Sequence, residues 1–117
     1  MEFNNKSPIY IQIVDEIIDD IIKKKYVAGE KMISIRDLAV KYTINQNTAM
    51  KCLKELELLG IIENRRGIGY FLTEDSKKIS SLKKEKVKTS IKNFIKDMSV
   101  AGFTKDEIIE LIEKEYE

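Results

Sequence analysis

The sequence predicts a mainly α-helical protein with a small β-wing, a winged helix-turn-helix followed by a C-terminal hairpin of two helices. Three observations support this fold class. Apolar residues recur at three- and four-residue spacing between recognisable helix caps, two short β-favouring runs flank a glycine turn, and a long amphipathic pattern closes the chain. The 117 residues can hold one small domain and an appendage. We expect the winged helix-turn-helix in residues 1–75 and a helical tail in residues 76–117.

A first helix is expected from about Pro8 to Lys25. Ser7 is the expected N-cap, and proline suits the first helical position, where its missing N–H costs nothing. Lysines 23–25 complement the negative end of the helix dipole, and Gly29 breaks the chain. The expected apolar stripe comprises Tyr10, Val14, Ile17, Ile18, Ile21 and Ile22.

A short extended segment at residues 31–33, with the character of a small strand, leads into a second helix. Ser34 is its expected cap, with Asp37 three residues later in the manner of a capping box. Arg36 should be exposed in the first turn. The expected core positions are Leu38, Ala39 and Tyr42.

The third helix, within residues 44–60, is the element around which the rest is organised. Asn45 can cap it, because its side-chain oxygen can accept an unpaired backbone N–H, and Gly60 supplies a left-handed residue at its end. After Tyr42, residues 43 and 44 make a tight turn, so the second and third helices have the form of a helix-turn-helix. The expected buried face comprises Ala49, Cys52, Leu53, Leu56 and Leu59.

The opposite face of the third helix is polar. Its side chains are Gln46, Asn47, Met50, Lys51 and Lys54. Amides can bond base edges and lysines can bond phosphates, so this helix is suited to entering the major groove of DNA with its N-terminal end. A solvated helix with a good cap would show the same pattern, and the neighbouring elements decide between the two interpretations.

Residues 61–72 predict a β-hairpin. Two β-favouring runs, 61–62 and 70–72, are separated by a turn containing Gly67 and Gly69. A wing of this kind would bring Arg65, Arg66 and the backbone of Gly67 beside a groove or a phosphate, where the planar guanidinium can form two hydrogen bonds.

The tail should form two helices, from Ser76 to about Ala101 and from Thr104 to about Glu115. Gly102 ends the first, and Thr104 with Glu107 makes a capping box. Both helices carry an apolar stripe that a two-helix hairpin cannot bury alone, so we expect a second copy of the chain to cover them. The stripes comprise Ile79, Leu82, Val87, Ile91, Phe94, Ile95 and Met98, and Ile108, Ile109, Leu111, Ile112 and Tyr116.

Charge is unevenly distributed although the net charge is only +1. Residues 77–96 are rich in lysine against the single acid Glu85, whereas the charged residues within 97–117 are mostly acidic. The sign of the charge in each region, rather than the net charge of the chain, should decide which partner binds that region.

Composition excludes several classes of function. Without histidine and with one cysteine, the chain cannot build a zinc site, an internal disulfide or a Ser-His or Cys-His nucleophile. No glycine-rich phosphate loop is present, so we expect no enzyme, metal or cofactor. No apolar run approaches the roughly 18 to 20 residues of a membrane span, and the start lacks the pattern of a signal peptide, so a cytoplasmic protein is expected. For Cys52 we favour a packing role over redox sensing.

Several motifs together resemble the GntR family of bacterial transcription regulators, with a short tail similar to that of the YtrA subfamily. They are PIYIQI at residues 8–13, G-E-K at 29–31, S-x-R-D-L-A at 34–39, N-x-N-T at 45–48, LKELELLGII at 53–62 and RRGIGYF at 65–71. The resemblance implies a dimer that binds a two-fold operator, often beside transporter operons. It implies contacts from Arg36, Asn45, Asn47, Thr48 and the wing at Gly67.

Three positions depart from the family pattern. Ile33 stands where proline is common, Gln46 where arginine or proline is common, and Met50 where arginine or another polar residue is usual. These departures leave the fold expectation intact and bear on the strength and sequence preference of DNA binding.

The expected function is sequence-specific DNA binding by a homodimeric transcription regulator, a repressor of a nearby operon. An alternative is a winged-helix module that docks protein, which exposed Met50 would favour. A small effector, if one exists, would have to lie at the dimer seam or between tail and head. The expected DNA-binding residues are Ser34, Arg36, Asn45, Gln46, Asn47, Thr48, Met50, Lys51, Arg65, Arg66 and Gly67.

Overall fold

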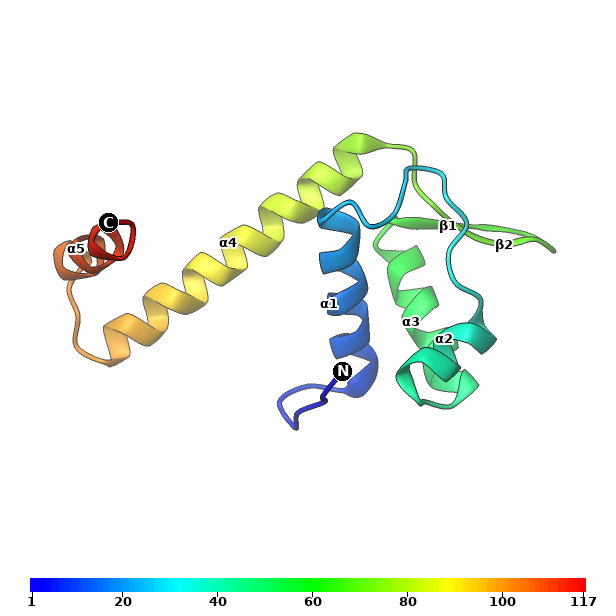
Figure 1. The fold of residues 1–117 in the computed structure, drawn as a ribbon, viewed down its shortest axis with the longest axis horizontal. Coiled ribbons are helices and arrows are strands. Elements are labelled where there is room, and N and C mark those ends of the chain that lie inside the picture. The colour runs from blue at the N-terminus through cyan, green and yellow to red at the C-terminus, as the bar shows by residue number, and fades with distance from the viewer. The chain divides into compact units, whose positions relative to one another are not determined.

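The computed structural model describes residues 1–117 and has the expected mainly helical fold (Figure 1). Contacts divide the chain into two compact units, residues 1–81 and 82–117. Every expected helix and both hairpin strands are present. In chain order the elements are α1 (Ile9–Ile22), α2 (Ile35–Tyr42), α3 (Gln46–Leu58), β1 (Ile62–Arg65), β2 (Gly69–Leu72), α4 (Ser76–Val100) and α5 (Lys105–Glu115).

Both ends of α1 differ from the prediction. Pro8, not Ser7, is the N-cap, because the backbone of Pro8 is extended and its carbonyl accepts from the N–H groups of Ile11 and Gln12. The side-chain amide of Gln12 donates to the carbonyls of Asn4 and Ser7 (both 2.8 Å) and holds the preceding segment against the helix. At the other end Lys24 turns left-handed (φ 61°), so the helix stops at Ile22 and not at Lys25.

The predicted caps of α2 and α3 are confirmed. Ser34 Oγ accepts from the N–H of Asp37 (3.1 Å), and Asn45 Oδ1 accepts from the N–H of Thr48 (2.8 Å). Thr43 takes a left-handed conformation (φ 54°) between the two helices, which turns the chain within three residues. Local side-chain-to-backbone bonds therefore set where each helix of the helix-turn-helix begins.

The end of α3 connects directly to the wing. Gly60 has φ 77°, its N–H donates to the carbonyl of Glu57, and the N–H of Ile61 donates to the carbonyl of Leu56. This pair of bonds is a Schellman motif, which ends a helix and satisfies its last carbonyls. The expectation that Leu59 is buried was wrong: it is 49% exposed, because the chain turns there and Ile61 fills the core position.

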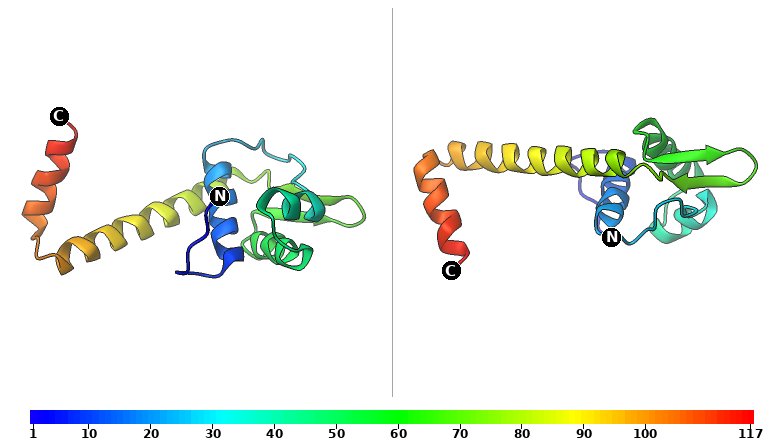
Figure 2. Two further views of the ribbon diagram at one scale, coloured as in Figure 1. Left: turned by 60° about the horizontal axis from the view of Figure 1, so that its bottom comes forward. Right: turned by 90° about the horizontal axis from the view of Figure 1, so that it is seen from above.

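β1 and β2 form an antiparallel hairpin, with Ile62 opposite Leu72 and Arg65 opposite Gly69. The strand expected at residues 31–33 is reduced to an isolated bridge between Lys31 and Phe71. The two further views in Figure 2 show the hairpin projecting beyond the end of α3 within the first unit.

The core of the first unit joins α1, α2, α3 and the base of the hairpin. Its fully buried large side chains come from every one of these elements: Ile13, Ile17, Leu38, Leu53, Leu56, Ile61 and Ile62. Ile13 and Gln12 are buried although neither was predicted on the apolar stripe of α1. This core fixes which face of α3 remains outside.

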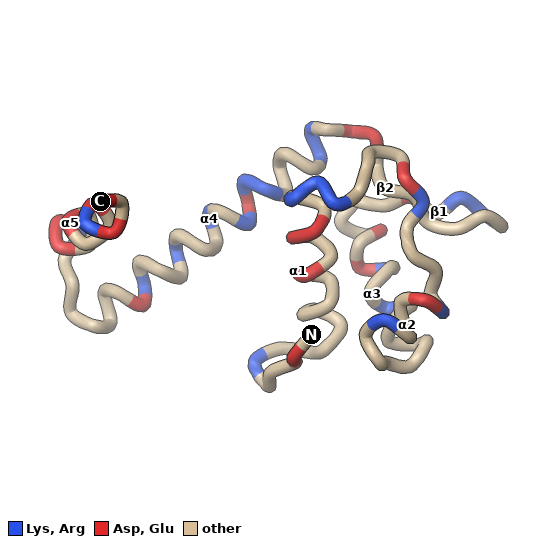
Figure 3. Tube along the Cα trace, in the orientation of Figure 1, with Lys and Arg blue, Asp and Glu red and all other residues tan.

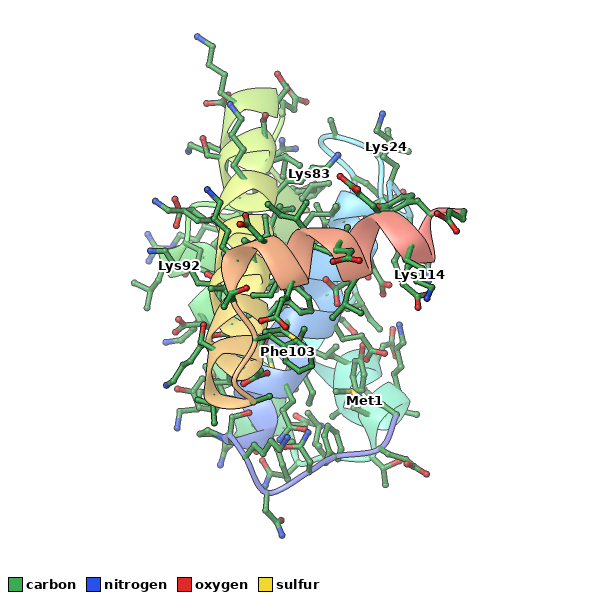
Figure 4. All side chains as sticks on the ribbon, turned by 90° about the vertical axis from the view of Figure 1, so that its left-hand side faces the viewer. Met1, Lys24, Lys83, Lys92, Phe103 and Lys114 are labelled. Carbon is green, nitrogen blue, oxygen red and sulfur yellow. The ribbon has the colours of Figure 1, made fainter.

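In the second unit, α4 and α5 meet at a turn containing Gly102 (φ 92°). The capping box is confirmed: Thr104 Oγ1 accepts from the N–H of Glu107 (3.3 Å), and Glu107 Oε1 accepts from the N–H of Thr104 (3.0 Å). Phe103, labelled in Figure 4, lies in this turn and remains partly exposed. Of the apolar residues of α4 and α5, only Ile108 is buried.

Candidate nucleic-acid interface

The first two turns of α3 present a polar surface. Ala49, Cys52, Leu53 and Leu56 are fully buried on the inner side of the helix. Because helical side chains project at about 100° per residue, the remaining positions must point outward. The outward residues are Asn45, Gln46, Asn47, Met50, Lys51 and Lys54, all exposed, with Thr48 partly exposed.

The start of α3 offers hydrogen-bond donors as well as side chains. As the first residues of the helix, Gln46 and Asn47 have N–H groups with no intrahelical acceptor. Asn45 Oδ1 is engaged by the N–H of Thr48, which leaves the amide nitrogen of Asn45 free to donate. The positive end of a helix dipole with free donors suits phosphate and base acceptors.

α2 contributes Arg36 beside this helix start. Arg36, Asn45 and Gln46 share the lining of a shallow hollow of about 490 Å³ between the two helices. Ser34, also among the predicted DNA-binding residues, uses its hydroxyl oxygen to accept from the N–H of Asp37, so its role in the structure is that of a helix cap. The structure thus brings part of the predicted set together at the α2–α3 corner.

The wing places its two arginines differently. Arg65 ends β1, and its guanidinium lies 4.1 Å from the centroid of the Phe71 ring. Arg66 and Gly67 lie in the turn, which is closed by the N–H of Ile68 donating to the carbonyl of Arg65 (2.9 Å). Gly67 has φ 80° and open space around it, so its backbone is accessible from outside.

Lys51 is supported by a residue that the sequence did not single out for this role. Its Nζ lies 4.5 Å from the centroid of the Tyr10 ring, a cation–π contact between α3 and the start of α1. Tyr10 was predicted only as part of the apolar stripe of α1. Met50, one position earlier, is 40% exposed.

Cys52 lies on the opposite side of α3. It is fully buried, and its Sγ donates to the carbonyl of Tyr10 (3.7 Å). Burial raises the pKa of the thiol from 9.0 to about 11, so it stays protonated at neutral pH. This agrees with a packing role.

Basic and acidic residues are unevenly distributed over the hairpin and α1 (Figure 3). In Figure 3 the Lys and Arg positions mark the turn of the hairpin, while Asp and Glu dominate the latter part of α1. No group of histidine, cysteine or acidic residues is arranged to hold a metal ion. No helix has the length and apolar character to cross a membrane.

The chain is similar in sequence and in fold to known bacterial transcription regulators. Residues 9–72 match the family described as bacterial regulatory proteins, gntR family. Over 93% of the chain and 90% of the relative, the sequence is 36% identical to the HTH-type transcriptional regulator YhcF of Bacillus subtilis. It is 34% identical to the HTH-type transcriptional repressor YtrA of the same organism, over 94% of the chain and 85% of the relative. A solved GntR family transcriptional regulator from Listeria monocytogenes is 40% identical and superposes with a TM-score of 0.88, covering 96% of this chain and 98% of that one.

Proposed function

The chain belongs to the gntR family of bacterial regulatory proteins, which are DNA-binding transcription regulators rather than enzymes, and we propose that it is a homodimeric repressor that binds a two-fold operator. The observation that carries the DNA-binding mode is the outward polar face of α3, fixed by the buried face beneath it. We assign the eleven residues predicted from the sequence to this interface, with Ser34 acting through its cap.

In the proposed mode, the N-terminal half of α3 enters the major groove. Asn47 and Gln46 are the candidates for base edges, because an amide can donate and accept at an adenine edge. Arg36 and Lys51 are the candidates for phosphates on either side of the groove. The wing turn at Arg66 and Gly67 would contact the adjacent backbone or minor groove.

The second unit supports dimer formation. Apolar side chains of α4 and α5 line a groove of about 480 Å³ that the single chain leaves open. Two of its members, Phe94 and Ile95, are 43% and 48% exposed. An exposed apolar surface of this kind is typical of an interface, and a second copy of the same hairpin is its proposed occupant.

The proposed repressor role is supported by the name of a relative, and the proposed target genes rest on the family resemblance alone. YtrA of Bacillus subtilis, 34% identical over most of both chains, is described as a repressor. An operator close to the promoter of a neighbouring operon, such as one with transporter genes, would allow the bound dimer to block transcription.

Selection of bound sequences from random DNA with the purified full chain tests this function. A two-fold symmetric consensus is expected for the parent protein, with strongly reduced recovery for Asn47→Ala and Arg36→Ala. Lys23→Ala, an exposed lysine at the end of α1, is the matched control and should recover the same consensus. Recovery of no enriched sequence by the parent protein would instead favour a protein-docking module.

A further inference from the structure

A lysine outside the predicted interface lies along the wing. The backbone of residues 29–32 follows the edge of β2 that β1 leaves free. The N–H of Met32 donates to the carbonyl of Tyr70 (2.7 Å), and the N–H of Leu72 donates to the carbonyl of Glu30 (2.8 Å). Lys31, between them, stands opposite Phe71 in an antiparallel bridge. The position of Lys31 is therefore fixed relative to the hairpin.

The register decides which face of the hairpin carries the Lys31 side chain. Directly opposed residues project on the same face of a sheet, and so do alternate residues along one strand. Lys31 consequently shares a face with Phe71, and with Arg65, which pairs with Gly69 two residues before Phe71. On this shared face, Arg65 approaches Phe71 from the edge of β2 that pairs with β1, and Lys31 lies at the other edge. The Arg65 guanidinium lies over the Phe71 ring.

Gly69 gives the lysine the space to reach toward the wing turn. A Cβ atom at Gly69 would lie 3.1 Å from Cε of Lys31 and 3.9 Å from its Nζ. The lysine side chain therefore extends from its own position opposite Phe71 over the backbone of Gly69, the first residue of β2 after the turn. A larger residue at this position would displace it.

The ammonium group of Lys31 is available to a ligand. Lys31 is exposed and forms no ion pair in the structure. The face also carries the acid Glu63, opposite Phe71 on β1, but Glu63 is likewise exposed and pairs with neither cation. With Arg65 and Arg66 at the same end of the hairpin, the local balance is positive.

We propose that Lys31 binds a DNA phosphate beside the wing, as a third wing cation that is positioned by the backbone pairing with β2 and for which Gly69 leaves space. The inference rests on the DNA-binding function proposed above. An ammonium group on a flexible stem acts as a point charge toward phosphate, whereas the bidentate reading of a guanine needs more exact placement. The contact should therefore add affinity for every DNA sequence and leave the operator preference unchanged.

The test measures the salt dependence of binding to a mixed-sequence DNA duplex with the full-length protein. Lys31→Met keeps most of the aliphatic stem over Gly69 and removes the charge. It should weaken binding and lower the slope of log affinity against log salt by about 0.9 per protomer between about 50 and 200 mM salt. Lys31→Arg should restore the slope, and Lys23→Met, the matched control, should leave it unchanged.

The outcomes separate the inference from the function on which it rests. If Lys31→Met binds DNA with the same salt slope as the parent protein, the proposed role of Lys31 is wrong and the proposed function stands. Absence of salt-dependent binding by the parent protein would overturn the proposed function itself. If Lys31→Met does not fold, Lys31→Gln also removes the charge and should lower the salt slope by the same amount.

Discussion

The guanidinium of Arg65 lies 4.1 Å from the centroid of the Phe71 ring, whereas Arg66, the next residue, lies in the turn and forms no ion pair. Arg65 therefore contributes to the fold as well as to the proposed interface, whereas Arg66 contributes to the interface alone. Substitutions of these two adjacent arginines should therefore differ in their effect on stability.

Arg66→Ala should reduce DNA affinity and lower the salt slope by about one unit without changing stability. Arg65→Ala should also reduce affinity, but it removes the cation–π contact with Phe71 and should cost about 0.5–1 kcal/mol in the free energy of unfolding. Urea unfolding and salt-dependent DNA binding measure the two effects. Equal stability losses in both variants would show that Arg65 is not held by the ring.

Asn45 combines a structural role with a proposed binding role, and two substitutions separate them. Asn45→Ala removes the cap and should cost about 1 kcal/mol of stability. Asn45→Asp retains a capping oxygen and adds a negative charge near the helix N-terminus, so stability should be kept. DNA affinity should nevertheless fall in the aspartate variant because its carboxylate faces phosphates. Full affinity in Asn45→Asp would place this end of α3 away from DNA.

Met50→Arg tests the orientation of α3 in the groove. Methionine can touch a thymine methyl group but cannot bond guanine or phosphate, so the parent should favour A·T pairs near this position. The arginine variant should bind non-specific DNA more tightly, steepen the salt slope by about one unit and shift the preference toward guanine. If the salt slope and the selected sequences match those of the parent, Met50 does not face the groove.

Ile95→Asp should convert the proposed dimer to a monomer, because it introduces a charge into the apolar groove of α4 and α5. Thr89→Asp, at an exposed position of α4 outside the groove lining, is the control and should remain dimeric. Light scattering at micromolar concentration reports the mass of each. A dimer that persists in Ile95→Asp would locate the interface elsewhere.

The buried thiol of Cys52 should make stability depend on alkaline pH. Its pKa is raised from 9.0 to about 11 by burial, so the unfolded chain releases the proton first. The contribution of the thiol to the free energy of unfolding is fully present below about pH 9. It is lost as the pH rises toward about 11, a loss on the order of 1–2 kcal/mol. Comparing urea unfolding of the parent and Cys52→Ala at about pH 8 and pH 10.5 isolates this term from the tyrosines. A constant difference between the two proteins would show that the thiol titrates normally.

Local signals account for the parts of the fold that the sequence predicted well. The Asn45 and Ser34 caps, the Gly60 stop and the Thr104–Glu107 capping box each depend on residues within one or two helical turns. Each of these hydrogen bonds joins residues close in the sequence, so the residue types alone are enough to predict it. The residues proposed for DNA contact remain predictions, although the structure places most of them on one exposed surface.

The features that escaped prediction depend on contacts distant in sequence or on conformations that residue type does not indicate. Lys31 joins β2 through a bridge to Phe71, forty residues later in the chain. Lys24 ends α1 in a left-handed conformation that usually favours glycine. Gln12 was not predicted on the apolar stripe, yet it is buried because the N-terminal segment folds back over it.

The Schellman motif at Gly60 has a mechanical consequence. Because the N–H of Ile61 is bonded to the carbonyl of Leu56, and the carbonyl of Ile61 accepts from the N–H of Thr73, no unbonded residue remains to act as a hinge between α3 and the hairpin. The helix and the wing should therefore move as one rigid body, with a preset span between their contacts. A duplex whose groove width does not match this span must itself deform, so base pairs that the protein never touches can contribute to its choice of site through their stiffness.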